Sequence, residues 1–114
     1  MEKIYELHAD LCKTFSNAKR LEIIDSLKDR ERSASELIEK IGLSKANLSQ
    51  HMSVLRSKGV ILTRRDGVNV YYRIVNPKII QACHLIREVL LEQFQEKGKM
   101  ASSLRQIKRD LHRI

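Results

Sequence analysis

The feature that most constrains the fold is a three-residue turn, Gly42-Leu43-Ser44, between two helical patterns. Glycine can adopt the left-handed conformation that ends a helix, and serine is a good N-cap for the next one. Ahead of the turn, Ser33 and Glu36 have the spacing of a capping box, which predicts a helix over Ala34–Ile41. Behind it, apolar residues recur at helical spacing from Ser44 to Ser57. The pattern therefore predicts a helix-turn-helix.

The second of these helices has an outer face suited to groove insertion. Its inward side carries Leu48, Met52 and Leu55, and its outward side carries small or hydrogen-bonding residues, namely Ala46, Asn47, Gln50, Ser53 and Ser57. An ordinary solvent-facing helix usually carries Glu and Lys pairs, whereas residues 45–55 contain no acidic residue. Asparagine and glutamine can bond adenine edges, and residues at a helix N-terminus can contact phosphates. The predicted DNA contacts are Ser44, Lys45, Asn47, Ser49 and Gln50, with His51 either half-buried or bonded to one phosphate.

A β-hairpin is predicted directly after this helix. Two β-rich runs, 60–65 and 69–74, flank a turn that contains Asp66-Gly67. Arg64 and Arg65 make the hairpin positive, and Asn69 near its tip can hydrogen-bond in a minor groove. We therefore expect the hairpin to be a wing that touches DNA.

The positive charge is concentrated where these DNA contacts are expected. The whole chain has a formal net charge of +8. Residues 44–73 carry 6 basic and 1 acidic side chains, and residues 97–114 carry the same numbers, whereas residues 1–43 carry 8 and 9. A surface that was charged only for solubility would not be divided in this way. A polyanionic partner such as nucleic acid is the better explanation.

Three further helices are expected, and the last of them points to a homodimer. A first helix has an apolar stripe of Ile4, Leu7, Leu11 and Phe15, and a second is expected over 19–28. After Pro77, a helix over 78–95 is apolar around much of its circumference, with Ile79, Cys83, Ile86, Leu90 and Phe94 in one stripe and further apolar residues beside it. A 114-residue monomer cannot readily cover such a helix on two sides, so a second subunit is the economical cover.

Residues 5–95 resemble the ArsR/SmtB family of winged-helix repressors. The resemblance rests on LSKANLSQHMSVLRSKGVILTRRDGVNVYYRI together with the upstream KTFSNAKRLEIIDSL. It implies a mainly α fold with a small β-hairpin, a winged helix-turn-helix that dimerises through its first and fifth helices. It also implies a homodimer that occupies an imperfect inverted repeat in double-stranded DNA and is released by a metal ion, metalloid or reactive sulfur species.

The chain departs from the family at the sites that would sense such a signal. Where many members have an ELCxC metal motif, this chain has Glu36-Leu37-Ile38-Glu39-Lys40, without a thiol. In the helix after Pro77, His84 and Glu88 are one turn apart, which fits a solvated polar face better than an ion site. The two known family metal sites are therefore not expected.

Two cysteines remain as sensing candidates, Cys12 and Cys83. The family's helix pairing would bring them together, and His8 lies one turn before Cys12. Oxidation or persulfide bridging of the two thiols is one interpretation, and a soft metal or metalloid ion held by both thiolates with help from His8 is another. In a third, both are small buried hydrophobic residues and the regulator has no cysteine-based sensing.

The chain is expected to consist of one domain and a C-terminal segment. Residues 1–96 are expected to form one domain, and residues 97–114 a basic helix or tail with Leu104, Ile107 and Leu111 at helical spacing. No long apolar run or signal peptide is seen, so a cytoplasmic protein without a membrane role is expected. An enzyme is not expected, because Cys12 with His8 is the one candidate pair and nothing around it completes a catalytic site.

Overall fold

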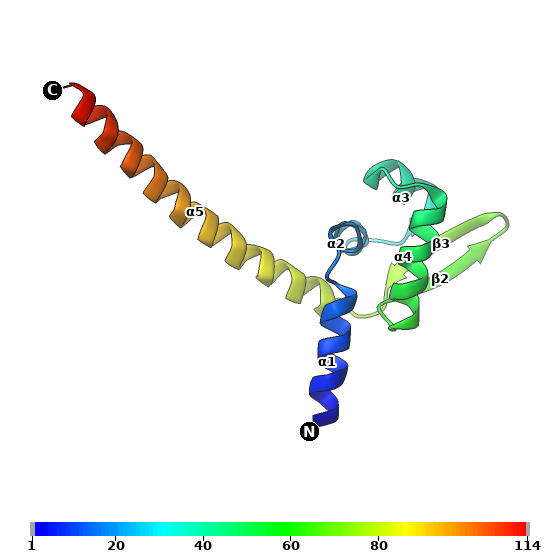
Figure 1. Cartoon of the computed structure of the whole chain (residues 1–114). Helices are drawn as coiled ribbons and strands as arrows, with labels where there is room; N and C mark the ends of the chain where they lie inside the picture. Colours follow the sequence, from blue (N-terminus) through cyan, green and yellow to red (C-terminus); the bar gives the residue numbers. More distant parts are fainter. Residues whose placement is uncertain (1, 114) are drawn as a thin grey trace. The chain divides into compact units, whose positions relative to one another are not determined.

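The computed structural model describes residues 2–113, with side chains described up to residue 110. Its elements, in order, are α1 (Glu2–Thr14), α2 (Ala18–Ser26), β1 (Arg32–Ser33), α3 (Ala34–Ile41), α4 (Lys45–Ser57), β2 (Ile61–Asp66), β3 (Asn69–Ile74) and α5 (Lys78–Arg113) (Figure 1). Contacts group the chain into two units, residues 1–80 and residues 81–114. The predicted class, mainly α with a winged helix-turn-helix, is confirmed.

Local capping explains where the helices of the helix-turn-helix begin and end. Ser33 and Glu36 form the predicted capping box at the start of α3, and Gly42 closes that helix at φ 76°. The Ser44 side chain then accepts a hydrogen bond from the Asn47 backbone N–H at 3.1 Å and caps α4. The bounds predicted for α3 are confirmed, and α4 starts one residue after its predicted cap.

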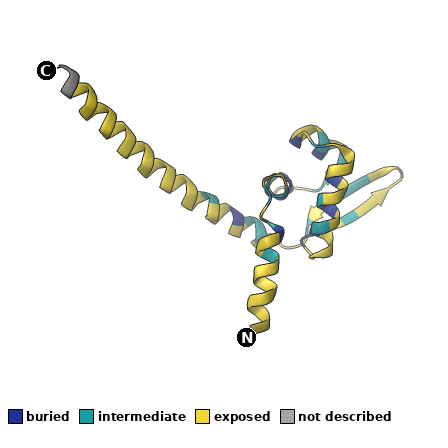
Figure 2. Cartoon of the chain, viewed as in Figure 1, coloured by how far each residue is buried: buried dark blue, intermediate teal, exposed yellow. Residues whose placement is uncertain are grey.

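The core of the first unit is built from α2, α3, α4 and the base of the hairpin. Its buried apolar residues are Ile23, Ile24, Leu27, Leu37, Ile41, Leu48, Met52, Leu55, Val60 and Ile61 (Figure 2). Leu48, Met52 and Leu55 were predicted to form the inward face of α4, and all three are buried. This packing fixes the opposite face of α4 outward.

The sheet has one strand more than the sequence predicts. Its order is β1-β3-β2, with both pairs antiparallel, and Arg32 lies opposite Tyr72. A two-residue strand is too short to produce an alternating pattern, and it exists only because β3 lies beside it. β1 joins the start of α3 directly to the wing.

Two helices have bounds that differ from the prediction. The helix expected over 19–28 spans Ala18–Ser26, because Asn17 caps its start and Leu27 leaves helical geometry at its end. The helix expected to end at Gln95 continues to Arg113, so residues 97–113 are not a separate short helix. A single glycine, Gly98, is tolerated within a helix, whereas the expected break had no proline to enforce it. The domain boundary after residue 96 stays a prediction.

Apolar side chains remain uncovered on two helices. On α1, Ile4 and Leu7 are each 55% exposed, although Leu11 and Phe15 pack against the core. On α5, the exposed apolar residues are Leu85, Ile86, Val89, Leu90, Leu91, Phe94, Met100, Leu104 and Ile107. Within the part of the chain that the structure describes, no helix is long and apolar enough to cross a membrane.

Candidate nucleic-acid interface

A groove of about 870 Å³ separates α4 from the wing. One wall is a polar stripe of α4 and the other is one face of the hairpin, while β1 and the start of α3 add Ser33, Ala34, Ser35 and Ile38. The polar side chains from α4 and the wing include Lys45, Ser49, Ser53, Arg56, Thr63, Arg65, Asn69 and Tyr72. The groove is therefore bordered by cations and hydroxyl groups, which are ligands for an anionic chain.

Helical spacing separates the outer surface of α4 into two stripes. Steps of three or four residues place Lys45, Ser49, Ser53 and Arg56 on the side that faces the wing. Asn47 and Gln50 are exposed but do not line the groove, since they lie farther around the helix. One helix thus presents amides on its outer side and cations with hydroxyls beside the wing.

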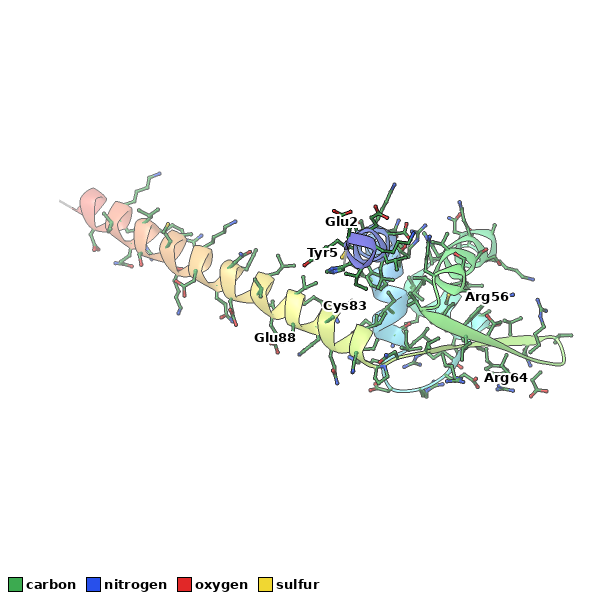
Figure 3. All side chains as sticks on the ribbon, turned by 90° about the horizontal axis from the view of Figure 1, so that it is seen from below. Glu2, Tyr5, Arg56, Arg64, Cys83 and Glu88 are labelled. Carbon is green, nitrogen blue, oxygen red and sulfur yellow. The ribbon has the colours of Figure 1, made fainter. Side chains whose placement is uncertain are left out.

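Strand alternation divides the wing in the same way. Thr63 pairs with Tyr72 and Arg65 with Val70, so these residues share the face that borders the groove. Arg64 pairs with Tyr71 on the other face, and its guanidinium lies 4.5 Å from the centre of the Tyr71 ring. Figure 3 labels Arg64 on the hairpin and Arg56 on α4.

Arg64 already has an anionic partner within the chain. Its Nη2 and Nε donate to the two carboxylate oxygens of Glu31, at 2.7 and 3.2 Å. The hydrogen bond from Arg64 lowers the pKa of the Glu31 carboxyl, which favours the ionised pair. Arg64 and Arg65 were both predicted to touch DNA, and the structure brings only Arg65 to the groove.

Arg56, Arg65 and Tyr72 all line the groove. Burial raises the pKa of the Tyr72 phenol, and the positive charges of Arg65 and Arg56 act on it in the opposite direction. Both guanidinium groups are therefore close enough for their fields to reach the phenol. Arg56 was missed by the sequence analysis, although it continues the spacing of Ser49 and Ser53.

The other predicted DNA contacts lie on the surfaces of α4 and the wing. Ser44, Lys45, Asn47, Ser49, Gln50 and Asn69 are exposed. His51 is half-buried, and its Nδ1 accepts a hydrogen bond from Arg20 Nε at 3.2 Å. The prediction that the His51 imidazole is half-buried is confirmed.

The sensing candidates do not form a metal centre within the single chain. Cys12 is exposed on α1, and Cys83 is 7% exposed on α5. Residues up to 110 contain no group of three or more His, Cys, Asp or Glu side chains that could hold a metal ion. His84 Nε2 lies 3.0 Å from Glu88 Oε1 on an exposed face of α5, as an ordinary one-turn pair. The thiol and metal interpretations stay predictions.

Comparisons with known proteins agree on the kind of molecule. The family described as bacterial regulatory protein, arsR family, matches residues 17–62. The HTH-type transcriptional regulator Rv0081 of Mycobacterium tuberculosis is 36% identical over 105 residues, which cover 91% of this chain and 92% of the relative. Its crystal structure covers 82% of this chain and 95% of its own, with a TM-score of 0.74 and 37% identity.

Two more proteins extend this likeness. A biofilm growth-associated repressor of Xylella fastidiosa is 34% identical over 93 residues, or 82% of each chain. The homodimeric winged helix-turn-helix DNA-binding domain of Mb0332 from Mycobacterium bovis has a TM-score of 0.74 at 26% identity. That match covers 83% of this chain and 88% of the domain.

Proposed function

The chain belongs to the ArsR family of bacterial transcriptional regulators, and we propose that it is a homodimeric repressor that a chemical signal releases from an inverted-repeat operator. The observation that carries the DNA-binding part is the groove between α4 and the wing. A helix in the major groove and a wing over the adjacent minor groove lie on either side of the same sugar-phosphate strand. The groove lining of arginine, lysine and hydroxyl groups suits that strand.

Each stripe of α4 has a separate task in this arrangement. Asn47 and Gln50 offer paired donors and acceptors to base edges, whereas Lys45 and Ser49 face the backbone strand. Across the groove, Arg65 binds phosphate and Asn69 reaches toward the minor groove. Arg64 contributes less than Arg65, because Glu31 already neutralises its charge.

The second subunit is proposed to cover the apolar faces of α1 and α5. Ile4 and Leu7 on α1, and Ile86 and Leu90 on α5, are each more than half exposed in the single chain. Burying apolar surface in a subunit interface stabilises the dimer by roughly 25 cal/mol for each Å² removed from water. The homodimeric Mb0332 domain supports this proposal, and a two-fold dimer would match the symmetry of the proposed operator with two half-sites.

The signal is proposed to act through Cys12 and Cys83. Thiol-reactive or reactive sulfur species would take two electrons from the pair of thiolates and link them directly or through added sulfur, while a polysulfide or peroxide is reduced. The exposed Cys12 is the thiol that such a reagent reaches first. The alternatives are a soft metal or metalloid ion bound by both thiolates, and release without any cysteine.

Binding to the protein's own upstream DNA tests the regulatory assignment. In a gel shift, we expect salt-sensitive binding by the wild type, and strongly weakened binding by the variant Gln50→Ala plus Arg65→Ala. The matched control is Glu39→Ala plus Lys40→Ala, which changes two exposed side chains on α3 outside the groove. Absence of salt-sensitive binding, or equal binding by both double variants, would exclude the proposed interface.

The proposed signal needs its own experiment. The dimer on DNA is treated in turn with polysulfide, peroxide, arsenite and Zn²⁺, and release is compared for wild type, Cys12→Ser and Cys83→Ser. Release by polysulfide or peroxide that both substitutions abolish supports the thiol switch, and release by arsenite or Zn²⁺ supports ion binding. Equal responses from all three proteins remove the cysteines from the mechanism.

A further inference from the structure

Arg20 of α2 connects the end of α1 to the DNA-reading helix. Its Nε donates to Nδ1 of His51 on α4 at 3.2 Å, and its Nη1 donates to the backbone carbonyl of Thr14 at 3.2 Å. Thr14 is the last residue of α1 and is buried. Because two acceptors from different elements hold one planar guanidinium, its orientation is fixed.

The contact with Arg20 determines which nitrogen of His51 carries the proton. The guanidinium N–H groups only donate, so the Nδ1 atom that receives this bond must present a lone pair. The ring is then neutral, and its proton lies on Nε2. Burial, followed by the positive charge of Arg20, lowers the pKa of the imidazole. Arg20 is the charged group that acts on this ring among the described side chains.

The position of His51 places this ring at the edge of the proposed DNA surface. It follows Asn47 by one turn, so both residues lie on the same side of α4. His51 is half-buried, and Arg20 of α2 donates a hydrogen bond to its ring. An Nε2–H group at this edge is suited to donate to a phosphate oxygen beside the major groove.

We propose that Arg20 is a positioning residue for operator binding, which holds His51 as a neutral Nε2–H donor to one DNA phosphate. The inference rests on the proposed function, since it assumes that α4 enters the major groove. It adds a residue of α2 to the DNA-binding apparatus. It also makes the end of α1, the helix that bears Cys12, a direct neighbour of the group that orients a DNA contact.

Nitrogen-15 NMR of the full-length protein without DNA tests the first half of the proposal. Two-bond proton correlations distinguish an imidazole protonated at Nε2 from one protonated at Nδ1. We expect wild-type His51 to be the Nε2–H form at pH 7.5, with a pKa below that of an exposed histidine, and the pKa to rise in Arg20→Met. An Nδ1–H form in the wild type, or an unchanged pKa in Arg20→Met, overturns the proposal.

A double-mutant cycle on operator affinity tests the second half. Loss of one hydrogen bond to a charged group in each subunit predicts that Arg20→Met weakens binding by about tenfold per half-site. If Arg20 acts through His51, the same substitution has little effect in a His51→Ala background. The same loss in both backgrounds would show that Arg20 acts by another route and would reject the proposal.

Controls separate this inference from folding and from the proposed function. Lys28→Met also removes one positive charge from an exposed site just after α2, and it should leave affinity unchanged. Thermal unfolding of each variant verifies that it is folded, and Arg20→Leu, which also removes the charge and the N–H donors, replaces Arg20→Met if that variant does not fold. Failure of the wild type to bind the operator rejects the proposed function, whereas normal wild-type binding with an additive cycle rejects only the role of Arg20.

Discussion

Neighbouring arginines in the wing have different chemical surroundings. Arg64 and Arg65 are consecutive, but a strand turns alternate side chains to opposite faces. Arg65 borders the groove, whereas Arg64 is held by Glu31 and stacks on Tyr71. The sequence shows two equal positive charges, because Glu31 is 33 positions away and its approach depends on the tertiary fold. The sequence alone therefore does not show that Arg65, and not Arg64, lines the groove.

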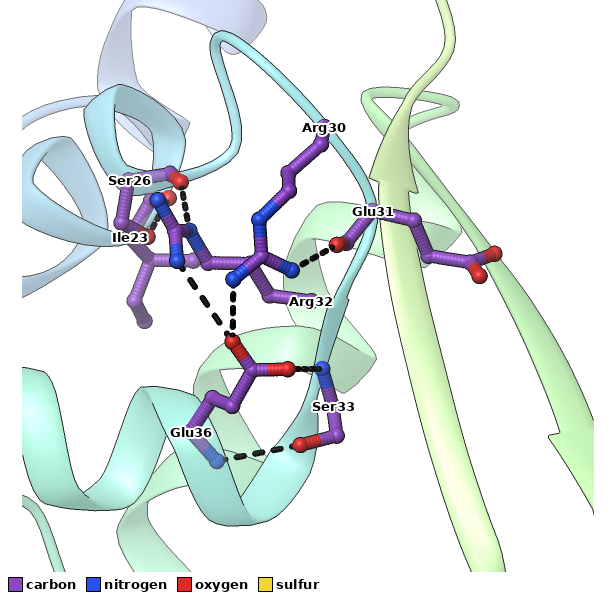
Figure 4. A network of polar contacts seen from close by, with 7 residues as sticks. All are labelled: Ile23, Ser26, Arg30, Glu31, Arg32, Ser33 and Glu36. Atoms are coloured by element: carbon purple, nitrogen blue, oxygen red, sulfur yellow. Dashed lines mark hydrogen bonds and ion pairs between the residues drawn. The ribbon is translucent and has the colours of Figure 1, made fainter.

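Glu36 connects the acid stability of the protein to the start of α3. Its carboxylate accepts hydrogen bonds from Arg30 Nη2 at 2.7 Å and from the Ser33 backbone N–H at 3.3 Å (Figure 4). These contacts, the Arg30 bond first, lower its pKa from 4.5 to about 2. The stabilisation is complete above the unfolded-state value and is lost as pH falls through about 2.

We therefore expect the thermal unfolding midpoint of the wild type to decrease more steeply between pH 4.5 and about 2 than that of Glu36→Gln. The amide keeps the shape of the side chain but does not titrate. Glu39→Gln changes an exposed carboxylate of the same helix and should retain the wild-type acid dependence. Parallel curves for wild type and Glu36→Gln would contradict the assignment.

Among the helices and strands, the sequence predicted correctly the ends of α3, which are set by capping residues close by in the chain. The bounds of α3 followed from Ser33, Glu36 and Gly42, since caps act within a few residues. The strand β1 and the full length of α5 could not be predicted in this way. β1 depends on pairing with β3, and α5 continues past Gly98 because one glycine weakens a helix without ending it.

The same division applies to the interface. The outer face of α4 could be predicted because its inward residues are periodic, and that periodicity fixes the opposite side. Arg56 and Tyr72 could be identified as groove residues only once the wing was placed beside α4. Arg20 could be identified only from its contact with His51, which is 31 positions away in the sequence.

The wing tip depends on one glycine. The two-residue loop between β2 and β3 has Gly67 at φ 62°, while Val68 is not in the positive-φ region. This is the pattern of a type II′ turn, which has glycine at its first central position. We expect Gly67→Ala to destabilise the domain by about 1 kcal/mol through backbone strain, because no neighbouring atom lies near the added methyl group.

Chemical denaturation measures this cost, and Val68→Ala is the matched control at a side chain that is 97% exposed. The control should unfold like the wild type. A Gly67→Ala protein as stable as the control would mean that the loop relaxes into another turn.

For the whole molecule, the proposed function requires two copies of the chain. Leu90 belongs to the apolar stripe of α5 and is 57% exposed, whereas Gln95 is an exposed polar residue of the same helix. We expect the wild type and Gln95→Lys to sediment as dimers and Leu90→Lys to sediment as a monomer. Because two linked half-site contacts reinforce each other, Leu90→Lys should also bind the operator at least about 10²-fold more weakly. A dimeric Leu90→Lys with normal affinity would remove α5 from the subunit interface.

In the proposed complex, one DNA backbone strand lies in the groove between α4 and the wing, and the salt dependence of operator affinity is the sharpest test of this placement. Each phosphate contact contributes about 0.9 to the slope of log Kd against log salt concentration. In a dimer, Arg56→Gln and Arg65→Gln should therefore each reduce the slope by about 2, whereas Arg64→Gln should leave it near the wild-type value. Equal slopes for wild type, Arg56→Gln and Arg65→Gln, or the largest reduction in Arg64→Gln, would show that the DNA does not occupy the groove.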